Sequence, residues 1–323
     1  MPATVADQAL VWQAALMFGA VCYTGCILER PTLVRRDPAW LAARRLDPRT
    51  VIIPVWRDRS FVVEGDPPQA ARIVGGLSAA AIEGAEQLVF LGCDGEGAAW
   101  FAADLSADGP DAIAQLAGGA AALPLRRVGA VLPPGDAAVL AYAQGIVHWH
   151  RRHRFCGVCG SMTESRDGGH LRVCTGAGCG AQHFPRTDPA VIMLVSRHDD
   201  EACLLARQAG WPRGMYSTLA GFVEPGESLE EAVTREVREE TGLYVTNVRY
   251  RGSQPWPFPS SIMLGFHAQT RTDAPIRLDA DELEHARWFT RAEIASFETE
   301  GLRLPSRDSI ARRLLAEWLD RSA

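Results

Sequence analysis

Short apolar runs, separated by stretches rich in Gly, Pro and Ala, recur along the whole chain. Four of these runs have the length of buried strands, namely VIIPVW at 51–56, EQLVFLG at 86–92, AVIMLVS at 190–196 and SIMLGFHAQ at 261–269. A proline-rich stretch at 254–259 predicts a loop, and the arginine-rich ending at 306–320 is typical of a helix. Because strand-like segments alternate with irregular and helical ones, the pattern predicts a mixed α/β protein.

The uncharged run at residues 8–28 predicts a buried helix followed by a strand. It is also long enough for a membrane span or a signal peptide. No Lys or Arg precedes the run, and Gln13, Tyr23 and Thr24 interrupt it. We therefore expect a buried segment and no membrane attachment.

Composition narrows the class of partner. The chain has 323 residues, of which 47% are hydrophobic and 22% charged, so it is long enough to form two or more domains. Its formal net charge of -6 gives no basic surface for binding along a nucleic-acid strand. Any nucleotide partner is therefore expected to be small, or to be only the end of a longer strand.

Four of the eight cysteines cluster in two close pairs, C-x2-C and C-x4-C, separated by fourteen residues. Two such pairs supply four thiolates for one tetrahedral zinc, and no open coordination position with a nearby general base suggests catalysis, so the zinc is expected to be structural. The second pair is wider than usual, so His170 or His183 stays open as a replacement ligand.

We expect His148–Arg154 to form a solvated or interfacial face. Clustered thiols also favour a reducing compartment, the cytoplasm. The cysteines are Cys156, Cys159, Cys174 and Cys179.

Residues 221–243, GFVEPGESLEEAVTREVREETGL, fit the pattern G-x5-E-x7-R-E-U-x-E-E-x-G-U, in which U is a bulky aliphatic residue. Ser228 and Glu231 predict a capping box, so the helix is expected to begin near Leu229 and to end at Gly242. Val233 and Val237 define the core-facing side of this helix, and Glu236, Glu239 and Glu240 lie on a different side.

Three acids of this helix, Glu236, Glu239 and Glu240, are spaced i, i+3 and i+4, so their carboxylates project from one face. Such crowded carboxylates repel one another unless cations lie between them, and oxygen ligands in this number suit Mg²⁺ or Mn²⁺. Arg235 is spaced to pair with Glu231 and Glu239, which indicates an orienting role.

This segment resembles the Nudix box, the catalytic motif of the Nudix hydrolase superfamily. The resemblance implies an α/β/α sandwich in which a metal-activated water attacks a diphosphate. It also implies that Glu236 and Glu240 bind the catalytic metal, that Glu239 supports them, and that the backbone carbonyl of Ala220 completes the ligand shell.

The segment Ser253–Ser261, SQPWPFPSS, resembles the signature of NADH pyrophosphatases within this superfamily. Trp256 and Phe258, held between prolines, predict a stiff aromatic loop that sandwiches a flat ring, with a turn that plugs the core as the alternative. The resemblance implies a substrate-binding set that consists of Phe184, Gln254, Pro255, Trp256, Pro257, Phe258, Pro259, Ser260, Ser261 and the backbone of Ala311.

The resemblance extends over most of the chain. It implies an N-terminal Nudix-like α/β domain at 1–147, a zinc ribbon with one structural zinc at 148–187 and a Nudix hydrolase domain at 188–323. Glu282 corresponds to a late metal-binding acid of the family, with the adjacent Asp281 as an alternative. Gly169 stands where some members contact the substrate through a glutamate, so that contact is absent or comes from elsewhere.

The reaction implied by the resemblance is hydrolysis of NADH or NAD⁺ to nicotinamide mononucleotide and AMP, together with removal of the NAD cap from RNA 5′ ends. The family is typically a homodimer whose site is completed across the interface. One alternative is an ADP-ribose or other dinucleotide pyrophosphatase. Another is a non-catalytic regulator that senses NAD-type nucleotides, which the complete set of acids disfavours.

Overall fold

The computed structural model describes residues 21–270 and 274–322, which form two compact units. The N-terminal unit comprises Cys22–Thr187 and Trp256–Ser260, and the C-terminal unit comprises Asp188–Pro255 and Ser261–Ala323, together with Val21. The helix expected in the uncharged run at 8–28 falls outside the described residues, which begin at 21. The strand expected after it is wrong, because residues 21–28 form a turn and irregular backbone. Within the described ranges, no helix is both long and apolar enough to cross a membrane.

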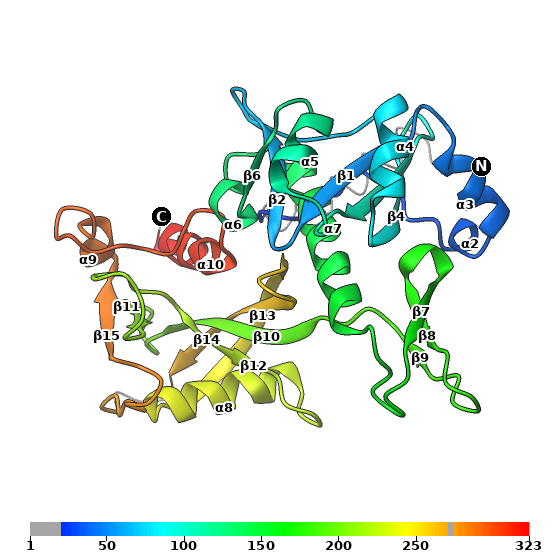
Figure 1. Cartoon of the computed structure of the whole chain (residues 1–323). Coiled ribbons are helices and arrows are strands. Elements are labelled where there is room, and N and C mark those ends of the chain that lie inside the picture. Colours follow the sequence, from blue (N-terminus) through cyan, green and yellow to red (C-terminus); the bar gives the residue numbers. More distant parts are fainter. Residues whose placement is uncertain (1–20, 271–273, 323) are drawn as a thin grey trace. The chain divides into compact units, whose positions relative to one another are not determined.

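The N-terminal unit is built on a mixed six-stranded sheet of order β3-β2-β1-β5-β4, with β6 beside β2. Figure 1 labels β1, β2, β4 and β6 of this sheet. β1 and β5 run parallel and the other pairs run antiparallel. The strands are β1 (Val51–Trp56), β2 (Arg59–Val63), β3 (Gln69–Ala70), β4 (Gln87–Cys93), β5 (Ala99–Asp104) and β6 (Ala121–Leu123). The helices are α2 (Thr32–Arg35), α3 (Pro38–Arg45), α4 (Gly76–Glu83), α5 (Pro110–Leu116), α6 (Leu125–Val128) and α7 (Pro134–Arg152).

Alternate residues of each central strand pack into different apolar clusters of this unit. On β1, Ile53 and Val55 join the cluster that contains the apolar side of α7, whereas Ile52 joins the cluster that contains Ala81 of α4 and Ile113 of α5. Because successive side chains of a strand point to opposite faces, helices cover both faces of the sheet. The first domain therefore has the mixed α/β class that the sequence predicted.

The long helix α7 carries charged side chains near both ends, and the sheet holds each of them. Near its start, the buried carboxylate of Asp136 accepts a hydrogen bond from the Ala70 N–H and lies 2.7 Å from the Arg72 guanidinium. Near its end, Arg151 donates to the buried carboxylate of Asp104 at 2.6 and 2.7 Å. An unpaired buried charge is costly, so these pairs fix the position of α7 on the sheet.

α7 continues to Arg152, and the expectation that His148–Arg154 form a solvated or interfacial face is therefore wrong for His150 and Arg151. The His150 side chain is buried, and its ring lies 2.8 Å from the Gly169 carbonyl and 2.9 Å from the Arg172 guanidinium. Helical periodicity turns position 150 toward the core, an orientation that the polar character of the segment conceals.

Residues after α7 form a three-stranded antiparallel sheet of order β7-β8-β9. Its elements are β7 (Thr163–Arg166), the short 3₁₀ helix η1 (Asp167–Gly169), β8 (Leu171–Cys174) and β9 (Gln182–His183). Cys174 ends β8, and the other three clustered cysteines lie in the turns and irregular segments beside this small sheet.

The C-terminal unit contains a second six-stranded sheet, of order β13-β14-β10-β11-β15, with β12 beside β10. Its central pair, β10 and β14, runs parallel over nine residue pairs from Asp188↔Ser261 to Ser196↔Gln269. The strands are β10 (Asp188–Ser196), β11 (Ala202–Arg207), β12 (Leu219–Phe222), β13 (Val245–Trp256), β14 (Ser261–Thr270) and β15 (His285–Thr290). The helices are α8 (Leu229–Thr241), α9 (Arg291–Ala295), α10 (Ile310–Leu319) and the 3₁₀ helix η2 (Asp320–Ser322).

The two long helices of this unit cover opposite faces of the sheet (Figure 1). Val191 and Met193 of β10 pack with the apolar side of α8, whereas Ile192 and Leu194 pack with α10, including the fully buried Trp318. The α/β/α sandwich expected for the last domain is confirmed.

The strands predicted from the apolar runs are confirmed, but the proline-rich loop is shorter than expected. β13 extends to Trp256, so Gln254 and Pro255 belong to a strand and only residues 257–260 form the turn. β13 lies at the edge of its sheet, where a proline that lacks an N–H group is tolerated.

Three largely buried histidines are expected to make stability depend on pH. Burial lowers the pKa values of His150, His170 and His267 from 6.5 to about 4. Between about pH 4 and 6.5 these histidines bind protons in the unfolded chain but not in the folded chain. The contribution of the neutral rings to stability is therefore present above about pH 6.5 and is lost as the pH falls toward 4. We expect NMR titration of the ring protons to show three histidines that stay neutral at pH 5. Rings that all titrate near pH 6.5 would contradict this expectation.

Candidate active site and zinc site

The capped helix α8 carries the crowded acids. Ser228 accepts a hydrogen bond from the Glu231 N–H, Glu231 accepts one from the Ser228 N–H, and Gly242 ends the helix with a φ of 69°. The predicted helix bounds and the capping box are therefore confirmed. Val233 and Val237 are fully buried, as expected, which fixes the rotation of the helix and hence the direction of its acidic face.

Glu236 and Glu240 are buried, whereas Glu239 is exposed. Burial, together with the charges of Glu236 and Glu282, raises the pKa of Glu240 to about 8. Burial also raises the pKa of Glu236, although the neighbouring Arg235 guanidinium opposes the shift. The ionised forms of the two buried acids are therefore destabilised, and a nearby positive charge stabilises them.

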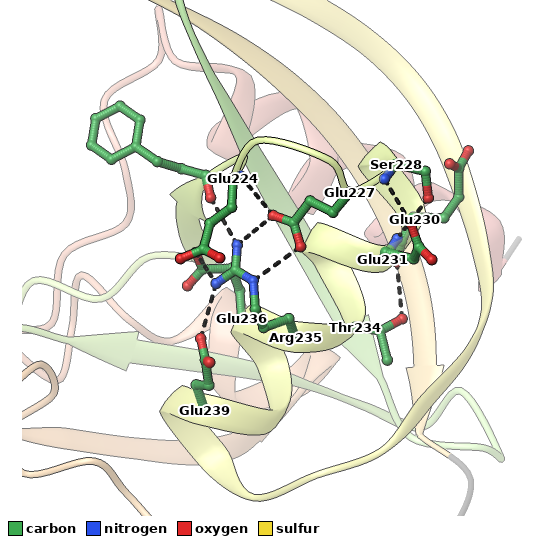
Figure 2. A network of polar contacts seen from close by, with 10 residues as sticks. Glu224, Glu227, Ser228, Glu230, Glu231, Thr234, Arg235, Glu236 and Glu239 are labelled. Carbon is green, nitrogen blue, oxygen red and sulfur yellow. Dashed lines mark hydrogen bonds and ion pairs between the residues drawn. The ribbon is translucent and has the colours of Figure 1, made fainter.

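Arg235 connects the acids of this region, as Figure 2 shows. Its guanidinium donates to Glu236 and Glu239 at 2.9 Å each, to both carboxylate oxygens of Glu227 at 2.6 and 3.0 Å, and to the Phe222 carbonyl at 2.9 Å. These partners occupy its donors in several directions, so its planar group is held in one orientation. Arg235 thereby acts as a positioning residue for Glu236.

The expected pair between Arg235 and Glu231 is wrong. Glu231 is engaged in the capping box, and Glu227 from the preceding loop takes its place beside the guanidinium (Figure 2). Spacing along the helix identified the pair with Glu239 correctly, but a partner in a loop is decided by tertiary packing.

Gly221 is required by the close approach of β12 to α8. A Cβ atom at this position would lie 1.9 Å from the carboxyl carbon of Glu236. Any side chain here would push the carboxylate away, which explains why the motif begins with glycine. The adjacent Ala220, the expected source of a carbonyl ligand, lies on the same strand.

The loop before β15 brings further acids to α8. The Asp279 N–H donates to the Glu240 carbonyl at 3.1 Å, and the charges of Glu282 and Asp279 both raise the pKa of Glu240. Glu282 therefore lies within electrostatic reach of the helix acids. Asp279 was missed by the sequence interpretation, although the acid-rich stretch DADELE at 279–284 is a signal that could have found it.

The donor set fits a divalent cation. One carboxylate oxygen of Glu240, Oε2, is buried and has no hydrogen-bond partner among the described residues. An orphaned buried anionic oxygen is costly, and a cation relieves that cost. Carboxylate oxygens are the ligand type that Mg²⁺ and Mn²⁺ prefer, but among the described residues only the four clustered cysteines bring their ligand atoms within 4.8 Å of one another.

The four clustered cysteines converge as the sequence predicted, with sulfur atoms within 4.8 Å of one another. The Cys159 and Cys174 sulfurs are 3.3 Å apart and those of Cys156 and Cys179 are 3.9 Å apart. Tetrahedral zinc with bonds of about 2.3 Å places sulfurs at about 3.8 Å, so the group fits one structural zinc.

Neither histidine alternative replaces a cysteine in this group. His170 contacts the Phe90 carbonyl at 2.8 Å and the Tyr142 hydroxyl at 3.2 Å, so its inclusion is wrong. His183 lies 3.3 Å from the Cys156 sulfur, where its ring can donate a hydrogen bond to the thiolate. The four sulfurs already supply the four ligands of a tetrahedral site.

The aromatic loop packs partly into the N-terminal unit. Tyr23, which is buried, makes edge contacts with Trp256 and Phe258 at ring-centre distances of 6.1 and 5.7 Å. The Arg126 guanidinium lies over the Trp256 ring at 5.2 Å. Trp256 and Phe258 are only half-buried, so the loop both plugs a core and leaves aromatic surface exposed.

Gln254 has a structural role in this fold. Its side chain is fully buried, donates to the Asp308 carbonyl at 2.6 Å and accepts from the Ile310 N–H at 2.8 Å. The amide thus holds the start of α10. Its expected contact with substrate stays a prediction. The proline-rich sequence context conceals that this position lies in a buried strand.

The other expected substrate residues differ in exposure. Phe184 is 53% exposed, whereas Ala311 is buried in the first turn of α10 and offers only its backbone. Pro257 is buried and its carbonyl accepts a hydrogen bond from Gln144, whereas Pro255 and Pro259 are exposed and Ser260 and Ser261 are half-buried. Phe222, on β12 next to Gly221, is 61% exposed.

Gly169 cannot be replaced by the glutamate that some relatives are expected to use. Its φ is 94°, and a Cβ atom would lie 2.8 Å from the Val89 side chain. The glycine is therefore required by the close approach of η1 to β4. A glutamate contact with substrate at this position is excluded in this fold.

Glu240→Gln is expected to stabilise the metal-free protein at high pH. Because the pKa of Glu240 is raised to about 8 from 4.5, its contribution to stability falls as the pH rises between these values. Glutamine has the same size and no charge, so the melting temperature of the variant should exceed that of the wild type more at pH 9 than at pH 5. Glu230→Gln, an exposed change on the same helix, is the matched control. Equal differences at both pH values would refute the assignment of a buried charge.

Three family models match the chain in succession. The NADH pyrophosphatase-like rudimentary NUDIX domain matches residues 49–149, the NADH pyrophosphatase zinc ribbon domain matches 151–184 and the NUDIX domain matches 186–313. This order of parts is the one that the sequence predicted.

Two curated relatives carry the same kind of name. The NAD-capped RNA hydrolase NudC of Stutzerimonas stutzeri is 43% identical over 228 residues, which are 71% of this chain and 75% of that protein. The NAD-capped RNA hydrolase NUDT12 of Homo sapiens is 42% identical over 194 residues, so the match spans 57% of this chain but only 42% of that relative. A crystal structure of a NUDIX hydrolase from Nitrosomonas europaea is 23% identical, with a TM-score of 0.41, and the match covers 52% of this chain and 91% of that one. The chain belongs to the NADH pyrophosphatase and NAD-capped RNA hydrolase family of the Nudix superfamily.

Proposed function

We propose that this protein hydrolyses the diphosphate of NADH or NAD⁺ to nicotinamide mononucleotide and AMP, and that it removes the NAD cap from RNA 5′ ends. The observation that carries the proposal is the buried pair Glu236 and Glu240 on α8. Glu240 Oε2 has no hydrogen-bond partner among the described residues, and Arg235 of the same helix donates to Glu236. The printed names of the relatives support the choice of substrate.

Glu236, Glu240 and Glu282, with the Ala220 carbonyl, are the residues that would hold Mg²⁺ or Mn²⁺. A bound cation of this kind neutralises diphosphate charge and lowers the pKa of an attacking water. Arg235 keeps Glu236 in place, and Glu239 shares the same guanidinium nitrogen. The chain therefore supplies a prepared acidic surface that needs little reorganisation when the substrate binds.

Aromatic side chains are proposed to bind the rings of the substrate. Trp256 and Phe258 are half-buried, and Phe222 and Phe184 are exposed, so each presents ring surface for stacking. The proposal includes a cytoplasmic homodimer, as the family resemblance implies. The free state of all eight cysteines, which lie within the described residues, is consistent with a reducing compartment.

Turnover of a substrate panel tests the proposal. We expect the purified protein with Mn²⁺ to cleave NADH, NAD⁺ and NAD-capped RNA faster than ADP-ribose. Glu240→Gln should lower kcat by at least about a hundredfold, because a catalytic cation contributes several kcal/mol. Glu230→Gln, on the exposed side of α8, should retain activity.

Three results would redirect the assignment. Preferred cleavage of ADP-ribose would favour the general dinucleotide pyrophosphatase. Binding of NAD⁺ without cleavage would favour the sensing regulator. Full activity of Glu240→Gln would remove the acids from the catalytic role.

Trp256→Ala tests the stacking of the nicotinamide end. Loss of one aromatic stacking surface should raise KM for NADH by about tenfold, with little change in KM for ADP-ribose, because stacking contributes about 1–3 kcal/mol per ring. Tyr23→Leu removes the edge contact that supports Trp256 without changing the loop itself, and it serves as the control. If both variants raise the two KM values equally, Trp256 acts only through packing.

A further inference from the structure

A cluster of polar side chains in the N-terminal unit contains none of the catalytic acids and none of the clustered cysteines. Tyr142 of α7 is at its centre. The Cζ atom of Arg30 lies 3.9 Å from the centre of the Tyr142 ring, and Arg35 donates to the Tyr142 hydroxyl at 3.5 Å. The His170 ring nitrogen Nε2 lies 3.2 Å from the same hydroxyl. Segments far apart in the sequence thus bring two cations, a phenol and an imidazole together.

The two cations of this cluster are not neutralised by the chain. Among the residues that the structure describes, neither Arg30 nor Arg35 forms an ion pair. Asp167, the acid whose charge acts on His170, pairs instead with Arg36 at 3.4 Å. Burial lowers the pKa of His170 to about 4, and the charges of Arg35 and Arg30 add to this effect. Both positive charges therefore act on the same small region without a counter-charge.

The Tyr142 hydroxyl has neighbours that donate but none that accepts. His170 Nε2 also lies 2.8 Å from the Phe90 carbonyl, which can only accept, so we assign the ring proton to Nε2. A protonated Nε2 has no lone pair for the phenol, and a guanidinium cannot accept either. Within the described part of the chain, the hydrogen of the Tyr142 hydroxyl therefore has no acceptor.

Two guanidiniums and one hydroxyl form a donor set for a doubly charged oxyanion. Arg30 is exposed, and Arg35 and Tyr142 are half-buried, so solvent reaches part of the cluster. The planar fork of arginine matches the oxygen atoms of phosphate. A phosphate monoester carries about two negative charges near neutral pH, which balance the two arginines. A carboxylate or a phosphodiester carries a single charge and leaves one arginine unbalanced.

We propose that Arg30, Arg35 and Tyr142 form a binding site for a phosphate dianion, the group that phosphomonoesters and inorganic phosphate share. The guanidiniums balance its charge, and the Tyr142 hydroxyl donates to one of its oxygen atoms. The site does not depend on the proposed hydrolysis, although cleavage of a dinucleotide diphosphate releases phosphomonoesters of the same class. It gives the N-terminal unit a ligand-binding role of its own.

Calorimetric titration of the full-length protein, at constant ionic strength and without added Mg²⁺ or Mn²⁺, tests the site. We expect methyl phosphate and inorganic phosphate to bind at least about tenfold more tightly than the singly charged dimethyl phosphate. Arg30→Gln should weaken binding of both dianions by about tenfold, because it removes a charged donor from an exposed position. Arg45→Gln, at an exposed position of α3 outside the cluster, is the matched control and should leave the affinity unchanged.

Tyr142→Phe tests the hydroxyl separately. It keeps the ring beneath Arg30 and removes only the O–H group, so the affinity for both dianions should fall by about fivefold. Tighter binding of methyl phosphate would identify a phosphomonoester as the ligand, and tighter binding of inorganic phosphate would identify the free ion. Either result supports the site.

The proposal is overturned by no saturable binding of either dianion, by equal affinity for dimethyl phosphate, or by an unchanged affinity in Arg30→Gln. If Tyr142→Phe does not fold, Arg30→Gln and the comparison of ligands on the parent protein still decide. Because turnover is not measured, failure of this site leaves the proposed hydrolase activity standing, and loss of that activity leaves this site standing.

Discussion

The burial of two carboxylates, Glu236 and Glu240, is the constraint on which the C-terminal unit depends. A buried anion needs positive charge, hydrogen bonds or a proton, and each neighbouring feature supplies one of these or makes room for the carboxylates. Arg235 holds Glu236, and Gly221 leaves space for its carboxyl group. The capping box and the αL glycine fix where the helix begins and ends, so the acids face the loop that carries Glu282. Two buried carboxylates that need a positive charge or a proton follow from these local requirements.

The N-terminal unit has a similar layered architecture but places its buried charges elsewhere. Asp104 and Asp136 hold the two ends of α7, and His150 with Arg172 joins that helix to the small cysteine-bearing sheet. Buried polar groups of this unit therefore determine the position of structural elements.

The proline-rich signature combines two physical roles within nine residues. Gln254 is buried and ties β13 to the start of α10, whereas Trp256 and Phe258 pack on Tyr23 and remain half-exposed. A single sequence signature thus contains both a buried scaffold residue and partly accessible aromatic rings. Burial distinguishes the two kinds of position, because the fully buried amide bonds backbone groups at the start of α10, whereas the half-buried rings keep part of their surface accessible.

The sequence by itself determined the features that depend on local spacing. Helical periodicity and capping residues placed α8 and its acids, and the paired cysteines predicted the zinc site, because backbone geometry fixes which side chains i, i+3 and i+4 lie together. Tertiary structure alone decided that Glu227 is the partner of Arg235, that His150 and Gln254 are buried, and that Gly169 leaves no room for a side chain. These outcomes depend on which distant elements pack against each position, and no local pattern of polarity contains that information.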